Sequence, residues 1–353
     1  MKSSIKFSNA DASFSKSLRH KVNVYFTANG KSRTGDWRIF LKAVILLMSM
    51  VVLYTLLLVI QPYWLISILL CIILGVNIAA IGFNIMHDAG HNSFAKRTGV
   101  NNFFSYTLNL VGGNIYLWKL KHNIAHHTYT NIEGEDHDIE IKFMRIHHDQ
   151  ELKKHHKFQR FYFVFLYGIS YLAWVFFQDY EKYFRQKLGK KSEKFKLPLK
   201  EKVIFWTSKI VHLCLFVVIP IITVGLGPAL LGLLITGGAC GICLAVVFQL
   251  AHVVEGVELA TVSEGLIEDE WMVHQLKSTA NFAIGDRVLT WLLGGLNFQV
   301  EHHLFPRISH VHYPAINKIV KETCEEFEVK YVEFKTFGGA FKSHLLAIQR
   351  MSI

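Results

Sequence analysis

The sequence predicts an all-α integral membrane protein with four transmembrane helices in two hairpins and a cytoplasmic helical cap that carries a two-metal histidine site. Three observations predict this fold class. The 353-residue chain is 51% hydrophobic and has a mean hydropathy of +0.28, more apolar than an ordinary soluble protein of this length. Four apolar stretches are each long enough to cross a bilayer. Three histidine clusters flank long apolar segments.

The four apolar stretches fall into two pairs. A helix needs about 20 apolar residues to cross the hydrocarbon core. The expected spans cover about residues 40–60, 64–86, 203–224 and 228–253. The turn within each pair is short and uncharged, so each pair is expected to form a hairpin.

Basic residues set the expected orientation. Residues 1–39 and the stretch from Lys182 to Lys202 are rich in Lys and Arg. The positive-inside rule therefore places both segments, and both chain termini, in the cytoplasm. The first long apolar run lies far from Met1 and has no small-residue cleavage pattern, so no removable signal peptide is expected.

This arrangement of spans predicts a basic cytoplasmic segment over residues 1–39 and one membrane-embedded domain over residues 40–353. The cytoplasmic cap is expected to comprise residues 87–202 and 254–353.

Two further apolar runs are ambiguous. If Phe103 to Leu117 crossed the membrane, the first two histidine clusters would face opposite compartments, so we interpret this run as a re-entrant or interfacial helix. Phe161 to Phe177 is long enough to span, but a crossing there would put the following lysines outside. It is also rich in Tyr and Trp, as suits the headgroup zone. We place it on the cytoplasmic surface.

The formal net charge is +11. Nucleic acid or an anionic membrane leaflet could explain such a charge, and the apolar spans favour the membrane, so no nucleic-acid partner is expected.

Cys240 and Cys243 form a C-x-x-C inside an apolar stretch, where thiols that pack helix against helix are favoured over a redox or metal role.

The histidine clusters point to metal chemistry. Their members are His87 and His91, then His122, His126 and His127, then His302 and His303. Histidines four residues apart lie on one helix face and can bind one ion. Adjacent histidines diverge by about a hundred degrees on a helix and can bind different ions. Seven imidazoles exceed the four to six ligands of a single ion, so two ions are expected.

Other residues are candidates for supporting roles. His252, at the cytoplasmic end of the fourth span, is an eighth candidate ligand, with an interfacial hydrogen bond as the alternative. Gln299, three residues before His302, is a candidate metal ligand or a hydrogen-bond partner of metal-bound water. A histidine that binds metal through one ring nitrogen usually donates a hydrogen bond from the other. The candidate acceptors of these hydrogen bonds are Asp88, Asp136, Asp138 and Glu301. Candidate substrate-channel residues are Trp271, His274 and Gln275.

The three motifs H-x-x-x-H, H-x-x-x-H-H and Q-x-x-H-H, in this order between paired spans, resemble the membrane fatty acid desaturases. Glutamine at position 299 resembles the front-end subgroup, which includes Δ6-, Δ5- and sphingolipid long-chain-base desaturases. Residues 86–93 and 126–131 are similar to bacterial sequences described as linoleoyl-CoA desaturase-like. The resemblance runs from about residue 40 to the C-terminus.

The resemblance implies two non-haem iron ions, O₂ as co-substrate and a cis double bond formed in a fatty acyl-CoA or acyl-lipid. It implies ligand roles for the seven box histidines and matches Gln299 and His252 to family positions. Zinc could replace iron in a purified sample. The chain lacks the His-Pro-Gly-Gly motif of a fused cytochrome b5, so a separate ferredoxin or cytochrome b5 is expected as electron donor. The bacterial inner membrane is the expected location.

Two alternatives remain open. A sphingoid-base desaturase or a lipid or alkane hydroxylase would use the same scaffold, although the glutamine of the third box favours fatty acyl desaturation. A non-catalytic metal-binding membrane protein is an alternative from a different class. Transporters and receptors usually carry polar residues at mid-bilayer, whereas the expected span centres here are apolar.

Overall fold

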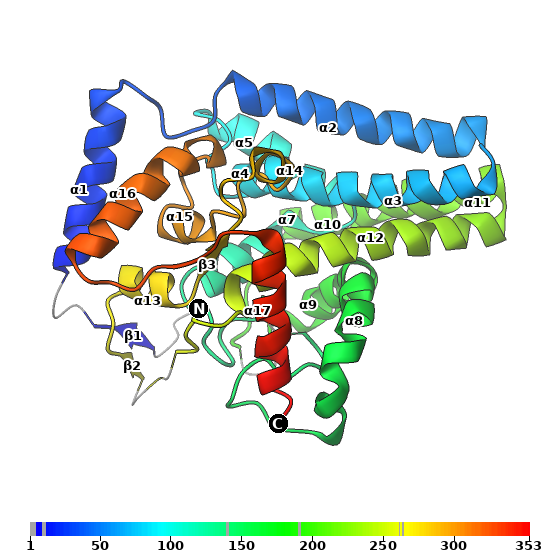
Figure 1. Ribbon diagram of the computed structural model, residues 1–353. Coiled ribbons are helices and arrows are strands. Elements are labelled where there is room, and N and C mark those ends of the chain that lie inside the picture. The colour runs from blue at the N-terminus through cyan, green and yellow to red at the C-terminus, as the bar shows by residue number, and fades with distance from the viewer. Residues whose placement is uncertain (1–4, 9–11, 139–140, 190–191, 261, 263–264) are drawn as a thin grey trace.

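The computed structural model describes residues 5–8, 12–138, 141–189, 192–260, 262 and 265–353. Within these residues the fold is mainly helical, with two small parallel sheets (Figure 1). The α-helices are α1 Ser13–Ala28, α2 Trp37–Thr55, α3 Trp64–Ile81, α4 His87–Gly90, α5 Thr98–Ser105, α6 Thr107–Leu110, α7 Ile115–Trp118, α8 Gln159–Ala173, α9 Asp179–Arg185, α10 Leu199–Leu213, α11 Ile219–Val224, α12 Leu226–His252, α13 Trp271–Lys277, α14 Arg287–Leu292, α15 Gln299–Leu304, α16 Tyr313–Glu326 and α17 Phe337–Arg350.

Shorter elements complete the chain. The π-helical segments are η1 Leu56–Ile60, η2 Gly82–Met86, η3 Lys119–His126, η5 Trp174–Gln178 and η6 Cys214–Val218, and the 3₁₀ turns are η4 Lys154–Phe158 and η7 His310–His312. Strand β1 Lys6–Phe7 pairs with β2 Leu266–Ile267, and β3 Ala280–Phe282 pairs with β4 Val332–Phe334.

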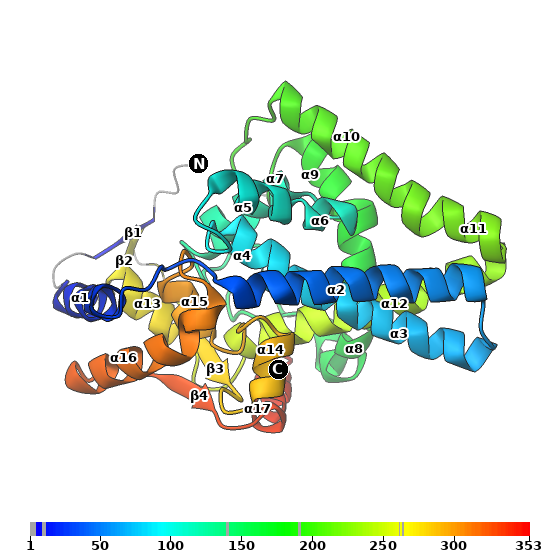
Figure 2. The same cartoon turned by 90° about the horizontal axis from the view of Figure 1, so that it is seen from above.

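Five continuous helices are long and apolar enough to cross a membrane: Trp37–Ile60, Trp64–Gly90, Lys154–Arg185, Leu199–Val224 and Leu226–His252. Four of them contain the expected spans. The fifth contains the run that we placed on the cytoplasmic surface, so the predicted count of four is not confirmed. Hydropathy and length alone do not separate a spanning helix from one that lies across the others. In both views α2, α3 and α12 run alongside one another, and α8 runs across them (Figures 1 and 2).

Small residues let the long helices approach closely. A Cβ atom added to Gly75 of α3 would lie 2.3 Å from the Thr236 carbonyl oxygen of α12. One added to Gly241 of α12 would lie 2.6 Å from the Tyr167 carbonyl oxygen of α8. Such close backbone contacts are typical of helix packing in membranes. The fully buried Cys240 lies at the contact with α3, as expected for a packing thiol.

The segment between the first two histidine clusters does not form one continuous helix. It is divided into α5, α6 and α7, with a turn at Gly112 and Gly113. Gly112 has a φ of +99°, and a Cβ there would lie 2.7 Å from the His212 ring, so both backbone conformation and space require glycine.

A buried ion pair holds this segment against α9 and α10. The Lys209 ammonium donates to the Gly112 carbonyl at 2.6 Å, the Val175 carbonyl at 2.9 Å and the Asp179 carboxylate at 2.9 Å. The lysine and aspartate side chains are 2% and 1% exposed. Trp174 Nε1 donates to the other carboxylate oxygen at 2.9 Å. The pair therefore connects three helical segments to the loop that precedes the second histidine cluster.

The cap is closed by amphipathic helices. Along α1, the side chains Phe14, Leu18, Val22 and Phe26 recur every four residues and are buried. They share a hydrophobic core with residues of α13, α15 and α16. In Figure 1 these helices lie at the end of the molecule opposite the α2–α3 and α11–α12 turns. This shared core holds α15, and with it the third histidine cluster, in place.

Candidate metal centre

Four chain segments bring eight histidine rings to one place. His87 begins α4 and His91 follows it, η3 supplies the second cluster, α12 ends at His252, and α15 supplies the third cluster. All eight rings are buried, with exposed fractions of 7% or less. The histidines are His87, His91, His122, His126, His127, His252, His302 and His303.

The ring nitrogens form three overlapping groups, in each of which one nitrogen per residue lies within 4.8 Å of the others. The groups are His87, His91, His122 and His302, then His126, His252 and His303, then His127, His302 and His303. The first two groups share no residue, and His127 lies between them with the adjacent pair of α15. The arrangement therefore offers positions for two neighbouring ions.

The second cluster departs from simple α-helical spacing. The His122 and His126 rings stack side by side, with centroids 5.1 Å apart, but they belong to different groups. The segment has a wider π-helical turn, in which the His127 amide donates to the His122 carbonyl at 3.1 Å. His122 Nε2 and His127 Nε2 are consequently only 3.2 Å apart. Single π-turns of this kind often occur at functional sites.

Ring nitrogens without hydrogen-bond partners show that the site fits metal ions. Among the described residues, the buried atoms without a partner include Nε2 of His91, His126, His252, His302 and His303, and Nδ1 of His127. Leaving one buried polar atom unpaired costs about 1–3 kcal/mol. Six such atoms gathered in one place are costly unless something binds them, and neutral imidazole nitrogens are suitable ligands for iron and zinc.

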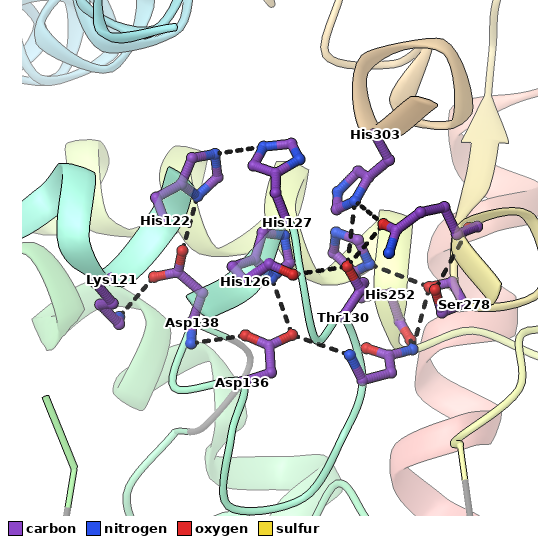
Figure 3. A network of polar contacts seen from close by, with 12 residues as sticks. Lys121, His122, His126, His127, Thr130, Asp136, Asp138, His252, Ser278 and His303 are labelled. Carbon is purple, nitrogen blue, oxygen red and sulfur yellow. Dashed lines mark hydrogen bonds and ion pairs between the residues drawn. The ribbon is translucent and has the colours of Figure 1, made fainter. Parts of the chain in front are cut away.

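Two carboxylates orient rings of the second cluster (Figure 3). His122 Nδ1 lies 2.7 Å from Asp138 Oδ2, and His126 Nδ1 lies 2.9 Å from Asp136 Oδ2. An Nδ1–H that donates to a carboxylate leaves Nε2 free for a metal. Burial alone would raise the pKa of Asp138, but the Lys121 ammonium at 2.7 Å and His122 hold that pKa well below its ordinary value.

The other two predicted acceptors have different partners. Asp88 accepts from Ser309 Oγ at 2.7 Å and His310 Nδ1 at 3.0 Å. Glu301 accepts from Asn281 at 2.7 Å and Asn317 at 3.0 Å, and burial raises its pKa to about 7. Each carboxylate follows or precedes a cluster histidine in the sequence. Neighbours on a helix point in different directions, so these two carboxylates contact polar side chains outside the histidine clusters instead of the cluster rings.

The three predicted channel residues are part of the support around the rings. Gln275 Oε1 lies 2.9 Å from His303 Nδ1, and His274 Nε2 lies 2.9 Å from the Thr130 carbonyl oxygen. Trp271 Nε1 donates to the His127 carbonyl at 3.2 Å. His274 and Gln275 are buried, and His274 also lines a cavity of about 310 Å³. A role of these residues in a substrate channel stays a prediction.

Several supporting residues were missed by sequence analysis. Tyr313 Oη lies 3.1 Å from His302 Nδ1. The Trp118 ring stacks on His122 with centroids 4.5 Å apart. Asn131 donates its side-chain amide to the His252 carbonyl at 3.0 Å and its backbone N–H to Asp136 at 3.0 Å. Its φ of +59° suits asparagine, but this angle is visible only in the structure.

Gln299 is the first residue of α15 and is buried. It lies about one helical turn before His302 and His303, so it belongs to the same short helix as the third cluster.

Comparison with known proteins adds a family match. The fatty acid desaturase family model matches residues 62–335. The chain is 35% identical to the sn-1 linoleoyl-lipid 6-desaturase of Arthrospira platensis, covering 96% of this chain and 93% of the relative. It is 33% identical to the sn-1 linoleoyl-lipid 6-desaturase of Synechocystis sp. over 96% and 95% of the two chains. It is 31% identical to the acyl-lipid (8-3)-desaturase of Physcomitrium patens over 95% and 71%.

Proposed function

Because the chain belongs to the fatty acid desaturase family, we propose that it inserts a cis double bond at carbon 6 of a linoleoyl chain carried by a membrane glycerolipid. Desaturase activity follows from the family and sets aside the non-catalytic alternative. The choice of an acyl-lipid over an acyl-CoA rests on the names of the cyanobacterial relatives, which the chain matches over nearly its whole length.

One structural observation carries the proposal: buried histidines from four segments converge with unpaired nitrogens directed to a common site. We assign the ligand role to the eight histidines and include Gln299 as a further ligand or water-binding residue. An unactivated methylene has no acidic proton and no leaving group, so acid–base catalysis cannot break its C–H bond. Two iron ions held by these residues would supply the O₂-dependent redox chemistry that this bond requires.

The residues of the chain prepare the site for this chemistry. Asp136 and Asp138 hold protons on the Nδ1 atoms of His126 and His122, so that each Nε2 stays available. The burial of all eight rings excludes bulk water, which protects reactive species from side reactions.

We further propose four transmembrane helices, with Lys154–Arg185 lying along the cytoplasmic surface of the inner membrane. The crosswise course of α8 in Figure 1 supports this placement. The rings would then lie on the cytoplasmic side, where both termini also lie. The net charge of +11 favours an acidic electron carrier, a ferredoxin or a cytochrome b5, as the separate donor.

Expression in a bacterial host without polyunsaturated lipids tests the substrate. Cells are fed linoleic acid, and lipid and acyl-CoA fractions are analysed by mass spectrometry that locates double bonds. We expect a new Δ6 bond first in glycerolipids, and none with a His303→Ala variant. A product hydroxylated instead of desaturated, or a first appearance in acyl-CoA, would contradict the proposal.

A further inference from the structure

The side-chain amide of Gln275, and not a carboxylate, lies beside the His303 ring among the described residues. His122 and His126 each have a carboxylate partner. His303 instead faces the neutral Gln275 Oε1, 2.9 Å from Nδ1. Gln275 and His303 are both 0% exposed. They come from different helices, α13 and α15, so α13 directly contacts a candidate ligand on the neighbouring helix.

The orientation of this amide decides which tautomer of His303 is favoured. An Oε1 atom can only accept, so it favours a proton on Nδ1 and leaves Nε2 unprotonated. His303 Nε2 is the nitrogen without a partner among the described residues. With the amide turned over, an N–H would face Nδ1, the proton would move to Nε2, and the ring could not bind a metal through that atom.

Thr130 contacts both residues and links them to His126. Its hydroxyl lies 2.9 Å from Gln275 Oε1, 2.7 Å from the His126 carbonyl oxygen and 3.3 Å from His303 Nδ1. The single hydrogen of this hydroxyl can be donated to the His126 carbonyl oxygen or to Gln275 Oε1. When it is donated to Gln275, the amide oxygen is held towards His303. Thr130 lies four residues after His126, in the turn that follows η3, so this hydroxyl connects two candidate ligands of the same group (Figure 3).

We propose that Gln275, supported by Thr130, is a positioning residue that holds His303 in the metal-binding tautomer and thereby controls the affinity of one of the two ions. The inference rests on the metal centre of the proposed function. It concerns the ion held by His126, His252 and His303, and it leaves the ion at His87, His91, His122 and His302 largely unaffected.

The test uses the full chain in detergent, stripped of metal and titrated with Co²⁺, whose visible absorption reports its ligands. The wild type is expected to bind two ions. Gln275→Leu removes the acceptor and should lower the affinity for one of the two ions about 10–100-fold. This is the usual effect of losing the hydrogen-bond partner of a metal ligand. Gln275→Glu keeps an acceptor that cannot be turned over, and it should restore binding of both ions.

Gln159→Leu is the matched control, because Gln159 is also fully buried and its described bonds go to Arg145 and Ile348 backbone groups. This variant can lower stability but should bind both ions normally. Thr130→Val, which keeps the shape of the side chain, should weaken the same ion as Gln275→Leu.

The outcomes separate the two proposals. Unchanged binding of both ions by Gln275→Leu, equal losses in Gln275→Leu and Gln159→Leu, or no rescue by Gln275→Glu would overturn the positioning role. A wild type that binds two ions but forms no Δ6 product would contradict the proposed substrate and leave the role of Gln275 standing. A wild type that binds no pair of ions would overturn both.

Discussion

Replacing Lys209 with methionine should destabilise the protein strongly. The substitution keeps the length of the side chain but removes the ammonium that contacts Gly112, Val175 and Asp179. The Asp179 carboxylate, 1% exposed, would keep the Trp174 N–H as its described side-chain partner. Leaving one member of a buried ion pair uncompensated costs about 3–5 kcal/mol. For a chain of this size, that corresponds to a lower melting temperature by roughly 4–7 °C.

The assay is thermal unfolding of the purified protein in detergent, followed by tryptophan fluorescence. A Lys209→Met/Asp179→Leu double variant removes both charges and should recover most of the loss, because replacing a whole buried pair by apolar residues is often neutral. Arg185→Met breaks the exposed pair with Glu181 and should change stability by less than about 1 kcal/mol. Wild-type stability of Lys209→Met, or a double variant less stable than the single one, would refute the reasoning.

Three further predictions concern the metal centre. His126→Ala removes a candidate ligand and should abolish product formation and lower bound iron, measured by product analysis and elemental analysis; wild-type activity would refute the ligand assignment. Gly90→Ala puts a Cβ 2.5 Å from Trp118 and should cost about 1–3 kcal/mol while displacing that ring, and an unchanged melting temperature would count against this contact. Gln299→His should keep part of the activity and Gln299→Ile none, and full activity of the isoleucine variant would make the position purely structural.

Sequence patterns predicted the features that depend on periodicity. The four apolar runs predicted helices near the observed positions, and the fixed spacing of the histidines predicted that these residues come together. Hydropathy does not decide the placement of Lys154–Arg185, because an apolar helix has the same composition whether it crosses the bilayer or lies on its surface. The direction of α8 relative to α12 is a tertiary property that no local pattern carries.

The partners of the rings could not be predicted in the same way. Asp88 and Glu301 were candidates because they adjoin cluster histidines, yet adjacency on a helix directs side chains apart. Gln275 and Tyr313 contact rings from other helices, and nothing in their local sequence marks them. Asp136 and Asp138 could be predicted from their position in the sequence, because a short loop after η3 brings them back to the rings of His122 and His126.

The order of the histidines along the chain sets a limit on biogenesis. His87 and His91 leave the ribosome first, whereas α15 is made near the end of translation. On the proposed ligand assignment, each of the first two histidine groups lacks one imidazole until α15 folds back. Stable loading of two ions would therefore have to wait for nearly complete synthesis, and a prematurely terminated chain would reach the membrane with both groups incomplete.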